Sequence, residues 1–200
     1  PLYVYEEKET IQSSLFDNAS GDKYIRKDGI SDFILKRAIE QYSKSVTKED
    51  IFYYITTLNE NYQQPAMQEG IEEGILKGIY KFKTVDAKEN HKVKLLGSGS
   101  IFQQVLSAAD VLANEYGISS DIYSVTSYNE LTRDGQDVER NNLLNVDTQD
   151  EIAYVDQILG SDDENIIIST TDYMKSYSEQ ISPFVKGSFK ALGTDGYGRS

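Results

Sequence analysis

Several groups of polar residues in this chain have types and spacings that could bind a ligand or move a proton. The turn Gly97-Ser98-Gly99-Ser100 lies between an apolar run and a helical pattern. In such a place, backbone N–H groups and a helix N-terminus can hold an anion. The turn lacks the lysine of a Walker motif and is not a complete dinucleotide fingerprint. The pattern therefore favours a tight structural turn, and an independent anion-binding module stays open as an alternative function.

Acidic residues and the single histidine supply the other candidates. Asp134, Asp137 and Glu139 lie close together, but their spacing is not that of a calcium loop. A capped, solvated helix start is the better interpretation, and the acidic stretch 162–164 is expected to be a solvated loop. His91 lies in a lysine-rich turn, which makes it a poor general base or metal ligand. The sequence thus predicts no catalytic, cofactor-binding or metal-binding residue in this chain.

The composition indicates a protein with a substantial core and a strong negative charge. The 200 residues are 38% hydrophobic and 11% aromatic, with a net charge of -13 and a pI of about 4.5. No basic stripe is present to release counterions from nucleic acid, and the charge disfavours an anionic membrane surface. The chain has no cysteine, so disulfides and thiolate chemistry are excluded. No apolar run reaches the ~18 residues of a spanning helix and no signal peptide is recognisable, so we expect a cytoplasmic location.

Strand-like and helix-like segments alternate from residue 79 onwards. Apolar and β-branched runs predict strands at 79–85, 93–96, 121–127, 165–169 and 189–192. Helical spacing predicts helices at 101–116, 129–144 and 149–159, and from Thr171 or Asp172 to about 181. The first helix is expected to bury Ile101, Val105, Ala108, Ala109 and Leu112. Gly117 and Gly160 are expected to end helices, and Gly135 to interrupt one. This alternation predicts an α/β fold of three layers with a mostly parallel sheet.

The first part of the chain has a different pattern. A turn-rich stretch at 17–28 predicts a loop, the spacing of apolar residues over 31–42 predicts a helix, and 51–55 predicts a strand. A polar stretch with Pro65 and with glycines at 70, 74 and 78 follows. It predicts a crossover between two folding units.

Six blocks of sequence carry a family resemblance. They are YYITTLNENY (53–62), EGIEEGILKGIY (69–80), LLGSGSI (95–101), SDIYSVTSYNELTRDGQDVER (120–140), STTDYMKSYSEQ (169–180) and LGTDGYGRS (192–200). With them the chain resembles the decarboxylase component of the homodimeric type of pyruvate dehydrogenase complex. That family belongs to the transketolase superfamily and depends on thiamine diphosphate. The likeness fades upstream of about residue 50.

The resemblance implies a domain division. Residues 1–58 would be the end of a divergent pyrimidine-side cofactor domain, 59–76 a crossover linker, and 77–200 a transketolase C-terminal-like domain truncated at its end. The parent enzyme would oxidatively decarboxylate pyruvate with thiamine diphosphate and Mg²⁺, and feed acetyl transfer to lipoyl groups. Its partners would be a second copy and the acetyltransferase component. This portion is expected to give scaffold and dimer contacts. The alternative is a degenerate, non-catalytic relative that acts as a binding or regulatory subunit.

Three departures bear on these expectations. The family's Mg²⁺-diphosphate cradle is a Gly-Asp-Gly with a later Asn, and the nearest match, Lys27-Asp28-Gly29 with Asn59 and Asn61, lacks the first glycine. We interpret it as coincidence, so the chain alone is predicted to be inactive and to bind no cofactor. When residues 11–13 are aligned with the family's Ile-Gln-Ser, the positions where the family has histidines carry Val4, Lys8 and Thr10. A different origin for the N-terminal segment therefore stays open. The third departure is Asn141, which stands where the family usually has Trp.

The end of the chain gives one further expectation. In the family another helix and strand follow the block at 192–200. A sheet that stops after Leu192 is therefore expected to leave the apolar faces of Phe189 and its neighbours exposed or covered by a partner.

Overall fold

The structure, a computed structural model, describes residues 65–88, 91–146 and 150–196. The chain divides into two units, Pro1–Glu69 and Gly70–Ser200, and the second holds every element described below. The helix predicted at 31–42 and the strand predicted at 51–55 lie outside the described residues.

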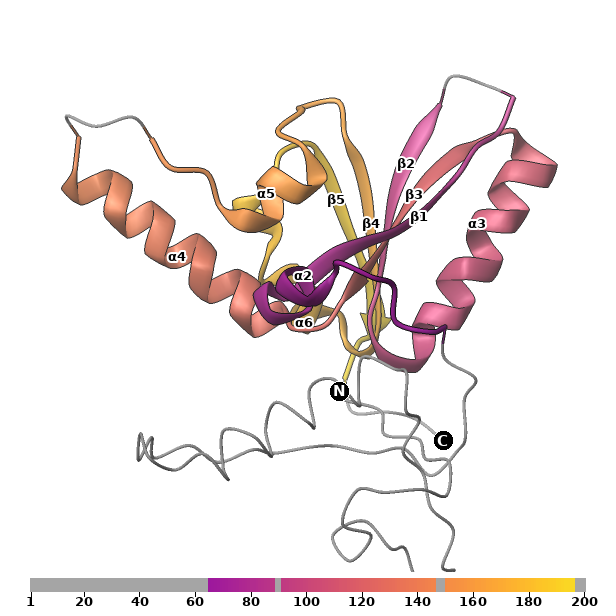
Figure 1. The fold of residues 1–200 in the computed structure, drawn as a ribbon, viewed down its shortest axis with the longest axis horizontal. Helices are drawn as coiled ribbons and strands as arrows, with labels where there is room; N and C mark the ends of the chain where they lie inside the picture. The colour runs from indigo at the N-terminus through magenta and orange to yellow at the C-terminus, as the bar shows by residue number, and fades with distance from the viewer. Residues whose placement is uncertain (1–64, 89–90, 147–149, 197–200) are drawn as a thin grey trace, which may run out of the picture. The chain divides into compact units, whose positions relative to one another are not determined.

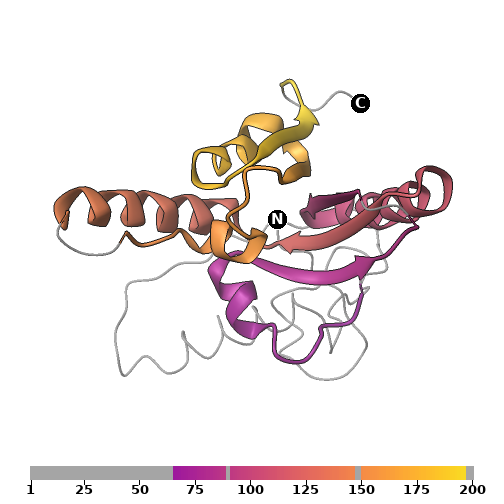
Figure 2. The same cartoon turned by 90° about the horizontal axis from the view of Figure 1, so that it is seen from above.

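Five strands form one sheet in the order β1-β3-β2-β4-β5. β1 runs antiparallel to β3, and the pairs β2–β3, β2–β4 and β4–β5 are parallel. Figure 2 shows the edge strands β1 and β5 at opposite ends of the sheet. The predicted α/β fold with a mostly parallel sheet is confirmed. In chain order the elements are α2 (Glu72–Lys77), β1 (Ile79–Val85), β2 (Lys92–Gly97), the 3-10 helix η2 (Gly99–Ile101), α3 (Phe102–Tyr116), β3 (Ser119–Val125), α4 (Tyr128–Leu144), α5 (Tyr154–Leu159), β4 (Ile166–Met174), α6 (Lys175–Glu179), the 3-10 helix η3 (Ser182–Phe184) and β5 (Ser188–Thr194).

Both faces of the sheet carry apolar side chains because successive residues of a strand point to opposite faces. Leu95 packs with Phe102, Val105 and Ala109 of α3 on one face. Its neighbour Leu96 joins a larger cluster with residues of α4 and α5 on the other face. Figure 1 shows α3 on one side of the strands, with α4 and α5 on the other. The second unit thus has three layers, and strands covered on both faces explain the nearly continuous apolar runs in its sequence.

The buried stripe of α3 differs in part from the predicted one. Phe102, Val105 and Ala109 are buried, whereas Ala108 is exposed and Ile101 and Leu112 are half-buried. The prediction for Ala108 was wrong because the face that meets the sheet starts at Phe102, so position 108 falls on the solvent side. Gly117 ends the helix with φ of 69°, as predicted.

α4 and α5 correct two predicted boundaries. α4 runs without interruption through Gly135, where a Cβ would come within 2.3 Å of the Phe184 ring. The glycine therefore allows η3 to pack closely on the helix, and the predicted break was wrong. α5 begins at Tyr154 and not near 149, because the Tyr154 N–H donates to the Asp134 carboxylate at 2.6 Å. Gly160 follows the helix directly, as predicted.

β4 is longer than predicted and replaces the start of a predicted helix. Thr171 and Asp172 lie within the strand and do not cap a helix, and α6 begins only at Lys175 with no side-chain cap. β4 pairs with β5 on both sides of these two residues, with Thr170 opposite Leu192 and Met174 opposite Thr194, and the register shifts between the two pairs. This long-range pairing outweighs the local capping signal of the polar residues.

β3 and β5 complete the sheet. β3 begins and ends two residues earlier than predicted, because Ser127 leaves the strand to cap α4 by accepting a hydrogen bond from the Glu130 N–H at 3.2 Å. On β5, Phe189 is half-buried against the larger cluster, while Leu192 is exposed. The expected exposure at the end of the sheet therefore falls on Leu192 and not on Phe189.

Candidate functional site

The carboxyl ends of β2 and β4 are the place where this topology favours a ligand. From β2 the chain passes through α3 to β3 on one side, and it later reaches β4 on the other side of β2. In open α/β sheets, ligands bind outside the carboxyl ends of strands where the order reverses in this way. The turn 97–100 follows β2 at this edge, so it is the first candidate site.

Buried hydroxyl groups at this edge of the sheet form hydrogen bonds with one another. Ser98 is buried; its N–H donates to the Thr170 carbonyl at 3.3 Å and its hydroxyl donates to Thr171 Oγ1 at 3.1 Å. Across the edge the Tyr128 hydroxyl lies 2.8 Å from Ser169 Oγ. We call Ser98, Tyr128, Ser169 and Thr171 the hydroxyl cluster. Because its members bond to one another, their hydroxyl groups are not free to hold an anion.

The chemistry of Tyr128 agrees with a structural role. Burial raises the pKa of Tyr128 to about 12, and the hydrogen bonds from Ser169 and Ser98 offset only part of that effect. The phenol therefore stays protonated at neutral pH and cannot act as a general base. Its ring also meets the Tyr177 ring edge-on, with centroids 5.4 Å apart. These contacts stabilise the junction between β4, α4 and α6.

Glycine at position 97 serves packing in the same turn. A Cβ there would lie 2.9 Å from Val105 Cγ2 and 3.0 Å from Phe102 Cδ2. The chain thus needs a glycine to bring the first turn of α3 against β2. This geometry supports the structural interpretation of the turn over the anion-binding one.

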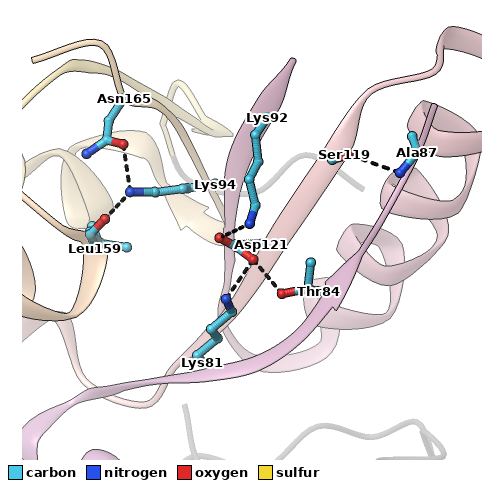
Figure 3. A network of polar contacts seen from close by, with 9 residues as sticks. All are labelled: Lys81, Thr84, Ala87, Lys92, Lys94, Ser119, Asp121, Leu159 and Asn165. Atoms are coloured by element: carbon cyan, nitrogen blue, oxygen red, sulfur yellow. Dashed lines mark hydrogen bonds and ion pairs between the residues drawn. The ribbon is translucent and has the colours of Figure 1, made fainter. Parts of the chain in front are cut away.

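A second polar group lies on the sheet near the start of β2 and β3. Figure 3 shows the Asp121 carboxylate between Lys81 and Lys92, whose ammonium groups lie 2.7 and 2.8 Å from its two oxygens. The Thr84 hydroxyl donates to the same carboxylate at 2.6 Å. Burial would raise the pKa of Asp121, but the hydrogen bonds from Lys81, Lys92 and Thr84 outweigh burial and hold the pKa below its usual value. These contacts join β1, β2 and β3 by paired charges.

Lys94 extends this charged group toward α5. Its ammonium donates to Asn165 Oδ1 at 2.6 Å and to the Leu159 carbonyl (Figure 3). Burial lowers the pKa of Lys94, and the negative charge of Asp121 partly restores it. Since both partners of the ammonium are neutral acceptors, Lys94 fixes the loop between α5 and β4 and does not pair with a second charge.

The acidic candidates serve local structure. Asp134 accepts the N–H at the start of α5, and Asp162 accepts the Glu164 N–H at 2.9 Å within the predicted loop. His91 is exposed, and its carbonyl accepts the Ser119 N–H at 2.9 Å. Among residues 65–88, 91–146 and 150–196, no group of three or more His, Asp or Glu side chains could hold a metal ion. No helix in the same ranges is long and apolar enough to cross a membrane.

Some positions singled out in the sequence lie outside the described residues, and the sequence analysis did not predict the hydroxyl cluster. The cradle-like residues 27–29, Asn59 and Asn61 lie outside the described residues, as do the three positions aligned with family histidines. Asn141 is exposed on α4. The hydroxyl cluster joins residues 98, 128, 169 and 171, which lie far apart in the sequence. Polar residues directly after two apolar strands were its only local signal.

Comparison with known proteins assigns the chain to a family. Residues 78–200 match the model of the transketolase-like C-terminal domain, and residues 1–64 match that of the type ISP C-terminal specificity domain. The pyruvate dehydrogenase E1 component of Escherichia coli K12 is 51% identical over 154 residues, which are 76% of this chain and 17% of the relative. Those of Haemophilus influenzae and Pseudomonas aeruginosa are each 50% identical, over 155 and 154 residues, with the same two shares. The chain thus spans about 17% of the length of these relatives. Because the first model covers more than half of its residues, the chain belongs to the transketolase-like C-terminal domain family.

Proposed function

We propose that this chain is the C-terminal portion of a pyruvate dehydrogenase, and that residues 77–200 give it scaffold and dimer contacts. The observation that carries the proposal is the 51% identity over 154 residues to a pyruvate dehydrogenase E1 component. In this proposal the parent enzyme is a cytoplasmic homodimer that decarboxylates pyruvate and passes the acetyl group to the lipoyl group of an acetyltransferase component.

The cofactor belongs to other parts of the parent enzyme in this proposal. Thiamine diphosphate, held through Mg²⁺, supplies the chemistry of decarboxylation there. The described residues do not fit that group, because they contain no cluster of metal-ligating side chains and the hydroxyl cluster satisfies its own members. What this domain contributes is packing: its sheet is covered on both faces, and the members of its hydroxyl cluster bond to one another.

The origin of the first residues stays a prediction. The domain division inferred from the resemblance assigns 1–58 to the end of the pyrimidine-side cofactor domain, followed by a crossover over 59–76. The match of residues 1–64 to the type ISP model supports the alternative of a different origin. The crossover agrees with the division of the chain between Glu69 and Gly70.

Turnover of pyruvate by two proteins tests the proposal. The isolated chain and the full-length gene product are assayed with pyruvate, thiamine diphosphate, Mg²⁺ and an artificial electron acceptor. We expect turnover by the full-length product and none by the isolated chain. A full-length product that folds but does not turn over would replace the enzyme by the degenerate binding or regulatory subunit. Turnover by the isolated chain would show that it carries a complete active site.

A further inference from the structure

One face of the sheet changes from apolar to charged along β2 and β3. Near the carboxyl ends of these strands, Leu96 and Tyr123 on this face belong to the larger cluster. Lys94 and Asp121 come two residues earlier on the two strands, so they lie on the same face. β2 and β3 are parallel, and the faces of parallel sheets are normally covered by apolar contacts. The charged end of this face therefore departs from the pattern of the rest of the domain.

A β-bulge in β1 adds side chains to this charged end. Lys81 pairs with Tyr123 and Thr84 pairs with Asp121, and the register shifts between Lys81 and Lys83. In a regular strand, residues three apart point to opposite faces. Here the Lys81 ammonium and the Thr84 hydroxyl both reach the Asp121 carboxylate, at 2.7 and 2.6 Å. The bulge thus turns both side chains toward one face, as bulges beside functional sites do.

Three lysines on this face carry more charge than the carboxylates beside them balance. They are Lys81, Lys92 and Lys94, and we call them the lysine face. Lys81 and Lys92 share the single carboxylate of Asp121 (Figure 3). Lys94 donates to two neutral oxygens, and the charge of Asp162 acts on it from the loop between α5 and β4. Three positive charges thus meet two negative ones, in a chain whose net charge is -13.

Lys81 and Lys92 are fixed in position and keep N–H donors for a partner. The Asp121 side chain is only 8% exposed and anchors both ammonium groups, whereas the two lysine side chains are 46% and 47% exposed. An ammonium has three N–H donors, and in the part of the chain that the structure describes each of these two forms an ion pair with Asp121 alone. Because the side chains are already ordered, the entropy cost of binding a partner is lowered.

We propose that the lysine face binds an acidic segment of a partner protein, one that carries two or more carboxylates. The Asp121 carboxylate already lies between the ammonium groups of Lys81 and Lys92, so a small anion cannot be enclosed by both of them (Figure 3). Carboxylates spaced along a segment can reach each lysine separately. A different protein is favoured over a second copy, because two chains of net charge -13 repel each other. This contact goes beyond the scaffold role proposed above and does not depend on it.

Binding of a labelled octaglutamate peptide, followed by fluorescence anisotropy at low ionic strength, tests the lysine face. This chain and the full-length gene product are both titrated. Each of Lys81→Gln and Lys92→Gln should weaken binding about threefold, as expected for the loss of one exposed ion pair. Lys190→Gln, at an exposed position of β5, removes the same charge and should leave the Kd unchanged. Raising the salt to about 0.5 M should abolish binding.

Asp121→Asn should give a change in the opposite direction. It removes the resident carboxylate and keeps both lysines, so the peptide should bind about threefold more tightly than to wild type. Asp110→Asn, at an exposed position of α3, removes one negative charge elsewhere and should leave the Kd nearly unchanged. A purely structural role of the lysines predicts no difference between these two variants. Circular dichroism of each variant verifies the fold.

Other outcomes overturn the proposal in distinct ways. Absence of binding to wild type, or equal weakening by Lys190→Gln, shows that the lysine face does not select the peptide. Inorganic phosphate that displaces the peptide at a concentration near the peptide's Kd assigns the lysines to a small anion. A dimer in sedimentation that is lost in Lys92→Gln assigns them to a second copy. Binding by this chain but not by the full-length product shows that another part of the parent covers the lysine face.

Discussion

Side chains at the carboxyl edge of β2 and β4 are buried and hydrogen-bonded, whereas those at the end of α4 are exposed. At the edge, where an α/β sheet usually binds its ligand, Ser98, Tyr128, Ser169 and Thr171 are satisfied by one another. At the end of α4, Leu143, Leu144 and Val146 are exposed in the part of the chain that the structure describes. Hydroxyl groups thus bond within the domain at the edge, whereas apolar side chains lie on its surface at the end of α4.

The comparison predicts very unequal effects on stability. Tyr128→Ala should lower the free energy of unfolding by about 4 kcal/mol, because it removes a fully buried ring together with its hydroxyl. Tyr128→Phe should cost about 1 kcal/mol, since it leaves Ser169 Oγ without its partner. Leu143→Ala at the exposed end of α4 should change the free energy of unfolding by less than about 0.5 kcal/mol. Urea unfolding measures all three, and a loss at Leu143 equal to that at Tyr128 would contradict the contrast.

The charged group around Asp121 extends the comparison to the other end of β2. Because its folded pKa lies below its unfolded value, its stabilisation is present above the unfolded pKa and is lost as pH falls through the folded pKa. Asp121→Asn should therefore lower the free energy of unfolding by about 1.5 kcal/mol at pH 7. The difference from wild type should shrink below about pH 4.

Urea unfolding at a series of pH values measures this dependence. Asp163→Asn, in the exposed loop between α5 and β4, controls for the loss of one negative charge. A difference between wild type and Asp121→Asn that stays the same from pH 7 to pH 3 would show that the lysine pairs do not stabilise the folded state.

Much of the fold could be predicted because its signals are local. Leu95 and Leu96 lie next to each other on β2 and enter opposite clusters, so a run of apolar residues marks a strand covered on both faces. The errors fall where a distant partner decides. Thr171 and Asp172 resemble a helix cap but lie within β4, whose pairing with β5 resumes at Met174, and Gly135 resembles a helix break but accommodates Phe184.

The two surfaces were harder to predict than the fold. The hydroxyl cluster depends on strand order, since β4 lies beside β2 only after α4 and α5 have crossed the sheet. The exposure at the end of α4 depends on how far this helix extends past the sheet. The sequence shows apolar residues at 143, 144 and 146, but it does not show that the sheet no longer covers the helix at these positions. The exposed apolar face expected from the sequence was that of Phe189 and its neighbours; Phe189 is half-buried against the larger cluster, whereas Leu192 is exposed.

Calorimetric titration of this chain with thiamine diphosphate in the presence of Mg²⁺ tests most directly whether the domain provides contacts and not a cofactor site. The described residues contain no metal-ligating cluster, and the hydroxyl cluster is closed, so we predict no saturable heat even at millimolar cofactor. A saturable one-to-one heat that disappears when Mg²⁺ is removed would contradict the account, because it would show that this chain alone holds the cofactor.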